Sequence, residues 1–151
     1  MILHSQNEKE TRQFGSKLTK KLEGGDIVAL SGDLGAGKTT FVKGLATGFG
    51  IKENILSPTF VLLRQYSVPL IPLSSDTLSL IHIDLYRLSK QSDISSLGLS
   101  DYLGKKNYIC VIEWAEKIKD YLKKFGKKVK WIEFKHIDKN TREIRVKIFN
   151  S

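Results

Sequence analysis

The sequence predicts a three-layer α/β fold around a mixed, largely parallel sheet, with a β-hairpin toward the C-terminal end. Short apolar runs typical of buried strands occur at 27–30, 80–84 and 108–113, and segments with helical spacing of apolar residues alternate with them. A glycine-rich segment follows the first run, where a strand would turn into a helix. Because the 151 residues contain no evident linker or repeat, we expect one domain spanning 1–151.

The first elements are expected to be an edge strand and a helix. Residues 1–4 predict the strand, and Ser-Gln-Asn-Glu at 5–8 matches a capping box that opens a helix. An apolar face with four-residue spacing follows, and Gly24 and Gly25 are predicted to end the helix.

The glycine-rich segment fits the pattern G-x-x-x-x-G-K-[ST] of a phosphate-binding P-loop. Its residues are Gly32, Asp33, Leu34, Gly35, Ala36, Gly37, Lys38 and Thr39. A helix capped at Gly50 is predicted to follow, and the free N–H groups at its start would bind phosphate oxygens. Lys38 would reach the β- and γ-phosphates, and the Thr39 hydroxyl would ligate Mg²⁺. The motif in this context predicts a P-loop NTPase-like fold with a nucleotide site.

The rest of the chain predicts strands separated by loops and helices. Ser-Pro-Thr at 57–59 is expected to be a stiff loop that enters a strand at 60–63, and 67–77 an exposed loop. Short helical turns are predicted at 93–103 and a helix at 114–125. Trp114 is expected in the core, with a contact near the metal-binding loop as the alternative. Strands at 129–137 and 142–148 flank a turn at 138–141, which predicts the hairpin.

Two carboxylates follow apolar strands, as the acid that serves a nucleotide's metal should. Asp84 ends the run at 80–84 and Glu113 ends the run at 108–113, so both should lie with the P-loop at one edge of the sheet. Either acid could hold Mg²⁺ while the other orients the attacking water. Thr59 offers a hydroxyl that could act as a switch, or it is a turn residue. His82 is expected to pack in the core, with catalysis as the alternative.

The net charge of +9 is concentrated near the C-terminal end. Residues 117–147 contain 12 Lys or Arg against 4 Asp or Glu, which amounts to +8. The excess indicates either an acidic or nucleic-acid partner or a solvated face. The single cysteine, Cys110, excludes an internal disulfide and favours a reducing compartment. No apolar run reaches the roughly 18 residues of a membrane span, so no membrane association is expected.

Five motifs in this order resemble one family. They are Gly-Asp-Leu-Gly-Ala-Gly-Lys-Thr-Thr at 32–40, Ser-Pro-Thr-Phe at 57–60, His-Ile-Asp-Leu-Tyr-Arg at 82–87, Leu-Gly-Leu-Ser-Asp-Tyr-Leu at 97–103 and Ile-Glu-Trp at 112–114. The set resembles TsaE, also called YjeE, the small bacterial ATPase of tRNA threonylcarbamoyladenosine synthesis. The resemblance implies a cytoplasmic, Mg²⁺-dependent ATPase with weak intrinsic turnover. It also implies binding to the TsaD–TsaB pair, with tRNA contacted indirectly through these partners.

The resemblance also implies roles for particular residues. Thr39 and Glu113 would ligate Mg²⁺, and Asp84 would be the acid near the γ-phosphate. Thr11 matches a position near the nucleotide, and Arg142 is matched to another. The phosphate-binding residues implied are Gly35, Ala36, Gly37, Lys38, Thr39 and Thr40. The segment 67–77 looks longer than is usual in the family.

Two other classes of function stay open at this point. A small-molecule kinase would share the P-loop and the acids, but it would also need an acceptor pocket and usually an arginine-rich lid. A nucleic-acid-binding module would explain the basic hairpin without catalysis, and it would usually interleave aromatics with the charges. Trp131 and Phe134 provide only a hint of that pattern.

Overall fold

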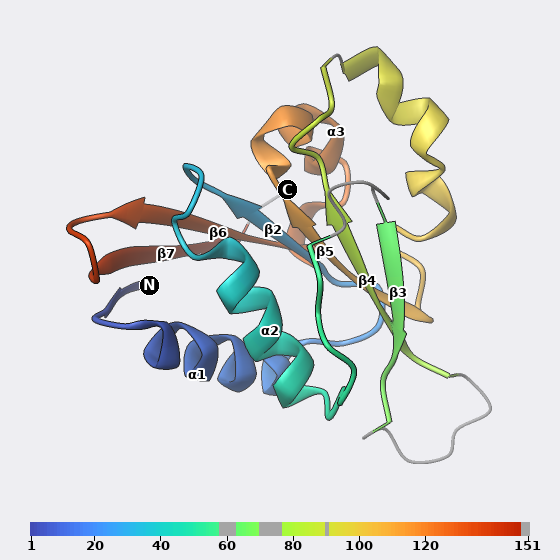
Figure 1. Ribbon diagram of the computed structural model, residues 1–151. Coiled ribbons are helices and arrows are strands. Elements are labelled where there is room, and N and C mark those ends of the chain that lie inside the picture. The colour runs from blue at the N-terminus through green and yellow to red at the C-terminus, as the bar shows by residue number, and fades with distance from the viewer. Residues whose placement is uncertain (58–62, 70–76, 90, 149–151) are drawn as a thin grey trace.

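The computed structural model describes residues 1–57, 63–69, 77–89 and 91–148 (Figure 1). Within these ranges seven strands form one sheet in the order β1-β7-β6-β2-β5-β4-β3. The central strands β6 (Val129–His136), β2 (Ile27–Ser31), β5 (Tyr108–Glu113) and β4 (Ser79–Asp84) are parallel. The outer strands β1 (Ile2–Ser5), β7 (Arg142–Ile148) and β3 (Leu63–Ser67) add antiparallel pairs. The predicted mixed α/β fold is confirmed.

The sheet is covered on both faces at its centre, which explains why nearly every residue of β2, β4 and β5 is buried. In β2, Val28 and Leu30 pack toward α1 (Glu8–Leu18) and α2 (Lys38–Gly48). Ile27 and Ala29 face the opposite layer. That layer consists of short 3₁₀ helices (Gln91–Leu97, Leu99–Asp101, Ala115–Ile118) and α3 (Lys119–Lys123), and Figure 1 shows it across the sheet from α1 and α2.

The N-terminal region corrects the predicted capping box. Helix α1 is capped by Asn7 rather than Ser5: the Asn7 side chain accepts the Glu10 N–H at 2.9 Å, and the Glu10 carboxylate accepts the Gln6 N–H at 2.8 Å. Ser5 instead belongs to β1, where its hydroxyl lies 2.7 Å from that of Thr11. The α-helix ends at Leu18 and continues as a 3₁₀ turn (Thr19–Lys21), so the predicted end at Gly24 and Gly25 was too late.

The predicted helix at 114–125 is also corrected. Trp114 has φ of 60°, the left-handed region, so the chain leaves β5 through a kink before any helix begins. Helical structure then comes in two short pieces, Ala115–Ile118 and Lys119–Lys123. The kink turns the first piece back over the sheet.

The remaining predicted elements have mixed outcomes. The hairpin of β6 and β7 and the turns around Gly98 (φ 64°) are confirmed, and Gly50 (φ 74°) follows the end of α2 as expected. Residues 58–62 and 70–76 lie outside the described residues, and with them Thr59, most of the strand predicted at 60–63 and most of the loop predicted at 67–77. None of the helices in the described ranges combines the length and apolar character that crossing a bilayer requires.

Candidate functional site

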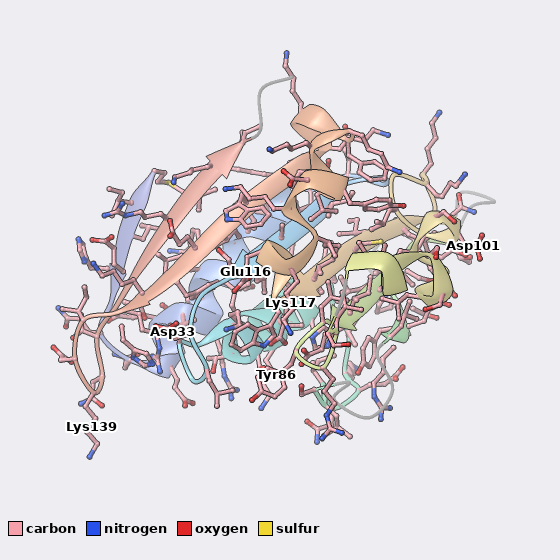
Figure 2. All side chains as sticks on the ribbon, turned by 90° about the horizontal axis from the view of Figure 1, so that it is seen from above. Asp33, Tyr86, Asp101, Glu116, Lys117 and Lys139 are labelled. Carbon is pink, nitrogen blue, oxygen red and sulfur yellow. The ribbon has the colours of Figure 1, made fainter. Side chains whose placement is uncertain are left out.

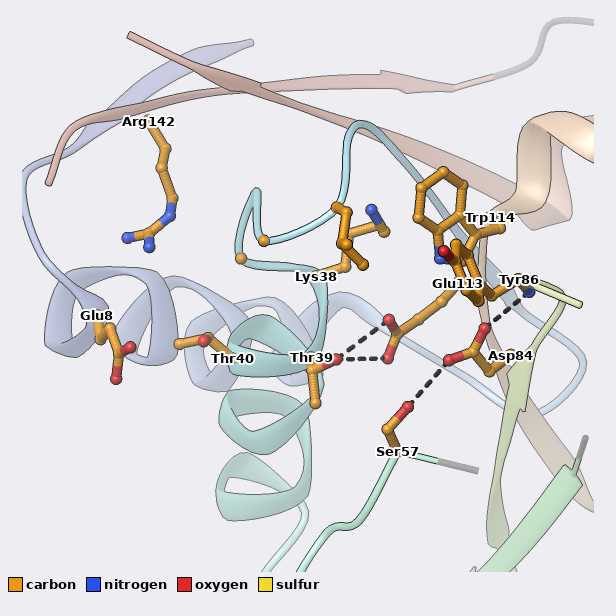
Figure 3. A pocket seen from close by; sticks show the side chains of 13 residues that line it. Glu8, Lys38, Thr39, Thr40, Ser57, Asp84, Tyr86, Glu113, Trp114 and Arg142 are labelled. Atoms are coloured by element: carbon orange, nitrogen blue, oxygen red, sulfur yellow. Dashed lines mark hydrogen bonds between the residues drawn. The ribbon is translucent and has the colours of Figure 1, made fainter. Parts of the chain in front are cut away.

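The P-loop connects β2 to α2 at the carboxyl edge of the sheet (Figure 3). Gly37 caps α2 with φ of 104°, and a Cβ at this position would lie 2.9 Å from Arg142 Nε. The left-handed backbone conformation therefore favours glycine here, and a side chain would also displace the Arg142 side chain. The first N–H groups of α2 consequently face open space, where they can bind an anion.

Lys38 folds back against its own loop. The Nζ atom donates to the carbonyl oxygens of Gly32 and, at 2.8 Å, Asp33, and it lies 4.1 Å from the centroid of the Trp114 ring. The side chain is only 4% exposed. Burial lowers the pKa of the Lys38 ammonium below its usual 10.5, against the opposing effect of several carboxylates, of which Glu113 has the largest. The cation therefore lies inside the cavity with its charge balanced by carbonyl dipoles and a π face.

Glu113 lies at the end of β5 and faces the start of α2. Both of its carboxylate oxygens accept from the Thr39 hydroxyl at 3.1 Å, and its Oε1 lies 2.8 Å from His82 Nε2. Glu113 is 3% exposed and His82 is fully buried. A hydroxyl and a carboxylate brought together in this way are the hard oxygen donors that Mg²⁺ prefers.

Asp84 is paired with Glu113 in the register of β4 and β5, so the two acids lie side by side at the sheet edge. The Asp84 Oδ2 accepts from the Ser57 hydroxyl at 2.9 Å, and Oδ1 accepts the Tyr86 N–H at 2.9 Å. These two donors hold the carboxylate toward the cavity (Figure 3). The expectation that both acids lie at one edge with the P-loop is confirmed.

Arg142 reaches the cavity from the opposite side, at the start of β7. Figure 3 shows its guanidinium projecting toward the start of α1 and α2, near Glu8 and Thr40. The residue is 9% exposed, and its Nε has no hydrogen-bond partner among the described residues. A buried, unpaired donor is costly, so this one favours a ligand with acceptor oxygens.

These elements surround an open cavity of about 360 Å³. Its lining residues are Glu8, Leu34, Gly35, Gly37, Lys38, Thr39, Thr40, Ser57, Asp84, Tyr86, Glu113, Trp114 and Arg142. Of the predicted site residues, Ala36 and Thr11 are the two absent from this wall. Ala36 is buried beneath the loop, and the Thr11 side chain is fully buried against Ser5. Their contact with nucleotide stays a prediction.

The cavity also contains residues outside the predicted set. Trp114 is half-buried at the wall rather than in the core, which agrees with the alternative of a contact near the loop, and its ring lies 5.1 Å from that of Tyr86. Ser57 and Glu8 line the cavity as well. The Ser-Pro-Thr motif could have predicted Ser57 as a lining residue of the cavity, and the position of Tyr86 two residues after Asp84 could have predicted Tyr86. For Glu8 the sequence offered only its place at the start of a helix.

Part of the basic segment at 117–147 is engaged within the molecule. Lys130 pairs with Asp26, whose side chain is 3% exposed, and Lys117 donates to the carbonyl oxygens of Tyr86 and, at 3.0 Å, Leu88. Lys139 lies at the tip of the hairpin, away from the cavity wall marked by Tyr86 (Figure 2). Other lysines of the segment are exposed, including Lys127, Lys135 and Lys139. Most of the predicted basic surface is therefore exposed, and Lys117, Lys130 and Arg142 are the basic residues of the segment that are not.

Comparison with known proteins finds similarity along most of the chain. The family described as "Threonylcarbamoyl adenosine biosynthesis protein TsaE" matches residues 5–144. A protein of Treponema pallidum (strain Nichols) named "tRNA threonylcarbamoyladenosine biosynthesis protein TsaE" is 40% identical over 121 residues, which cover 80% of this chain and 83% of that protein. A protein of the same name from Bacillus subtilis (strain 168) is 38% identical over 116 residues, which cover 77% of this chain and 67% of that protein.

The fold has a solved counterpart. The crystal structure of YdiB from Bacillus subtilis has a TM-score of 0.76 and 29% identity, and the match covers 99% of this chain and 86% of that one. The segment matched by the family, 5–144, contains every residue that lines the cavity.

Proposed function

The chain belongs to the TsaE family of threonylcarbamoyladenosine biosynthesis proteins, and from this premise we propose that it is a cytoplasmic, ATP-binding and ATP-hydrolysing subunit that acts with TsaD and TsaB on tRNA. The tRNA is reached through these partners. One observation supports the nucleotide site above all others: Lys38, Thr39, Asp84 and Glu113, from three separate segments of the sequence, line a single cavity at the start of α2.

The residues present fit a nucleotide with Mg²⁺. The N–H groups at the start of α2, together with Lys38 and Arg142, would bind the phosphates, and Thr39 and Glu113 would hold the metal. Mg²⁺ usually takes one or two carboxylates and completes its shell with water and phosphate oxygens, so a site of two protein ligands suits it. When bound, it neutralises charge on the phosphates.

Asp84 would orient the attacking water. Its carboxylate is held by Ser57 and the Tyr86 N–H, and it lies beside Glu113 without sharing the Thr39 hydroxyl. To reach the phosphates, the Lys38 ammonium would leave the carbonyl oxygens of Gly32 and Asp33. Nucleotide binding would therefore replace these carbonyl oxygens with phosphate oxygens as its hydrogen-bond acceptors.

The Lys38→Met variant tests the site. It should bind ATP weakly and reduce phosphate release by at least about 100-fold while the fold persists, because Lys38 stabilises charge on the transferred phosphoryl group. Phosphate release should be measured with the chain alone and with TsaD and TsaB, without any added acceptor. A rise with the partners is expected, whereas turnover only with a small-molecule acceptor would indicate a kinase. Unchanged turnover in folded Lys38→Met would refute the P-loop assignment.

The exposed part of the basic segment would serve the partners. Charge reversal there should weaken association with TsaD and TsaB, more so at low salt, yet leave ATP affinity within about twofold. The residues to reverse are Lys127, Lys135 and Lys139. A matched control reverses exposed lysines elsewhere, namely Lys9, Lys20 and Lys52. Equal association of both triple variants at every salt concentration would mean that the segment is only a solvated face.

A further inference from the structure

His82 is a fully buried polar residue placed diagonally from Glu113 on the same face of the sheet. It lies on β4 opposite Val111 of β5, so Glu113 is two residues farther along the neighbouring strand. Side chains two residues apart on a strand point to the same face, and long side chains reach such diagonal neighbours. The register of β4 and β5 therefore brings the imidazole to the carboxylate.

The imidazole makes one hydrogen bond. Its Nε2 lies 2.8 Å from Glu113 Oε1, and its Nδ1 has no partner among the described residues. A carboxylate only accepts, so the proton of this hydrogen bond lies on Nε2. Burying a polar atom without a partner costs about 1–3 kcal/mol, and an apolar residue would fill this part of the core without that cost. The hydrogen bond to Glu113 is what distinguishes histidine from leucine here.

We propose that His82 is a positioning residue that holds the Glu113 carboxylate in the orientation in which it faces Thr39. The inference rests on the proposed function, in which Glu113 and Thr39 bind Mg²⁺. Glu113 has several rotatable bonds and lies at the end of its strand, and the Thr39 hydroxyl has one proton to share between both carboxylate oxygens at 3.1 Å. The bond from His82 is therefore the shorter and more specific restraint on the carboxylate. Partners that orient metal ligands in this way typically change metal affinity by about 10–100-fold when removed.

The test uses three substitutions that separate the hydrogen bond from packing. His82→Gln places an N–H donor near the position of Nε2, His82→Asn places it near Nδ1, and His82→Leu fills the volume without a donor. ADP binding should be measured by calorimetry across Mg²⁺ concentrations and in EDTA, with thermal unfolding recorded for each variant. Glu113→Gln serves as the reference for loss of the metal ligand itself.

We expect the Leu and Asn variants to need about 10–100-fold more Mg²⁺ for half-maximal enhancement of ADP binding. The Gln variant should stay within about threefold of the unmodified chain, and affinity in EDTA should be unchanged throughout. Should His82→Leu fail to fold, the Gln and Asn pair still decides between hydrogen bond and packing. A Mg²⁺ requirement unchanged in both Leu and Asn, or raised equally in Gln and Asn, would overturn the positioning role. An unchanged requirement in Glu113→Gln would instead refute the metal assignment of the proposed function.

Discussion

Helices α1 and α2 pack so closely that adding a single methyl group between them should push them apart. A Cβ added at Gly44 of α2 would lie 2.2 Å from the carbonyl oxygen of Arg12 in α1 and 2.9 Å from its Cα. Atoms in contact prefer separations of about 3.5–4.0 Å, so α1 would have to retreat by roughly 1 Å. The obstacle is backbone, and no side-chain rotation can remove it.

The substitution Gly44→Ala is therefore expected to destabilise the chain. Overpacking of a close interface costs about 1–3 kcal/mol, and alanine recovers up to about 1 kcal/mol of helix propensity. With rigid backbone on the other side, we expect a net loss of about 1–2 kcal/mol. In a protein of this size each kcal/mol corresponds to about 2–4 °C, so the Tm should fall by about 2–8 °C.

Thermal unfolding followed by circular dichroism measures this effect. The matched control is Thr47→Ala on the exposed side of the same helix, which should leave the Tm unchanged or slightly raised because alanine favours helix. A Gly44→Ala protein as stable as the unmodified chain, or more stable, would show that the two helices separate at little cost and would refute the argument.

Three further predictions concern single residues. Asp84→Asn should keep Mg²⁺-dependent ATP binding within about threefold yet reduce phosphate release by at least about 100-fold, because the attacking water loses the carboxylate that orients it. Calorimetry measures the binding and a turnover assay the phosphate release, and a loss of ATP affinity as large as the loss of turnover would contradict this role. Lys130→Met should lower the free energy of unfolding in urea by about 1–3 kcal/mol, because the buried Asp26 carboxylate loses its cation and keeps only the Glu23 N–H. Lys127→Met should change it by less than about 0.5 kcal/mol, and equal effects of the two substitutions would refute this role of the pair. Burial raises the pKa of the Cys110 thiol to about 12, so a thiol reagent at about pH 8 should label the unfolded chain only, and rapid labelling of the folded chain would contradict this. The free energy of unfolding should also decline as the pH rises from about 9 toward 12, because the thiol loses its proton in the unfolded state first.

The site was predictable where chemistry depends on a local motif or on strand ends. The P-loop pattern places Lys38 and Thr39 at the start of a helix, and parallel strands that end in acids bring Asp84 and Glu113 to the same edge. The bond between His82 and Glu113 was not predicted, because it depends on the register of two strands separated by a long stretch of chain.

The errors arose from competition between side chains for hydrogen bonds and from local backbone geometry. Ser5 has the residue type of a helix cap, but its hydroxyl bonds to Thr11, so the cap falls to Asn7. Trp114 breaks a helical pattern of apolar residues because its backbone takes the left-handed conformation, which the periodicity does not encode. The charge of Lys130 looked like part of a free surface, but Asp26, a distant residue in sequence, neutralises it.

The order of strands in the sheet has a consequence for how the chain matures on the ribosome. Strand β1, the first to be synthesised, pairs with β7, the last described strand, and β7 also supplies Arg142 to the cavity. Until β7 emerges, β1 lacks the strand with which it pairs among the described residues and presents unpaired backbone groups to its surroundings. A nascent chain therefore gains no stabilisation from a complete nucleotide cavity until Arg142–Arg145, which pair with β1, have been synthesised.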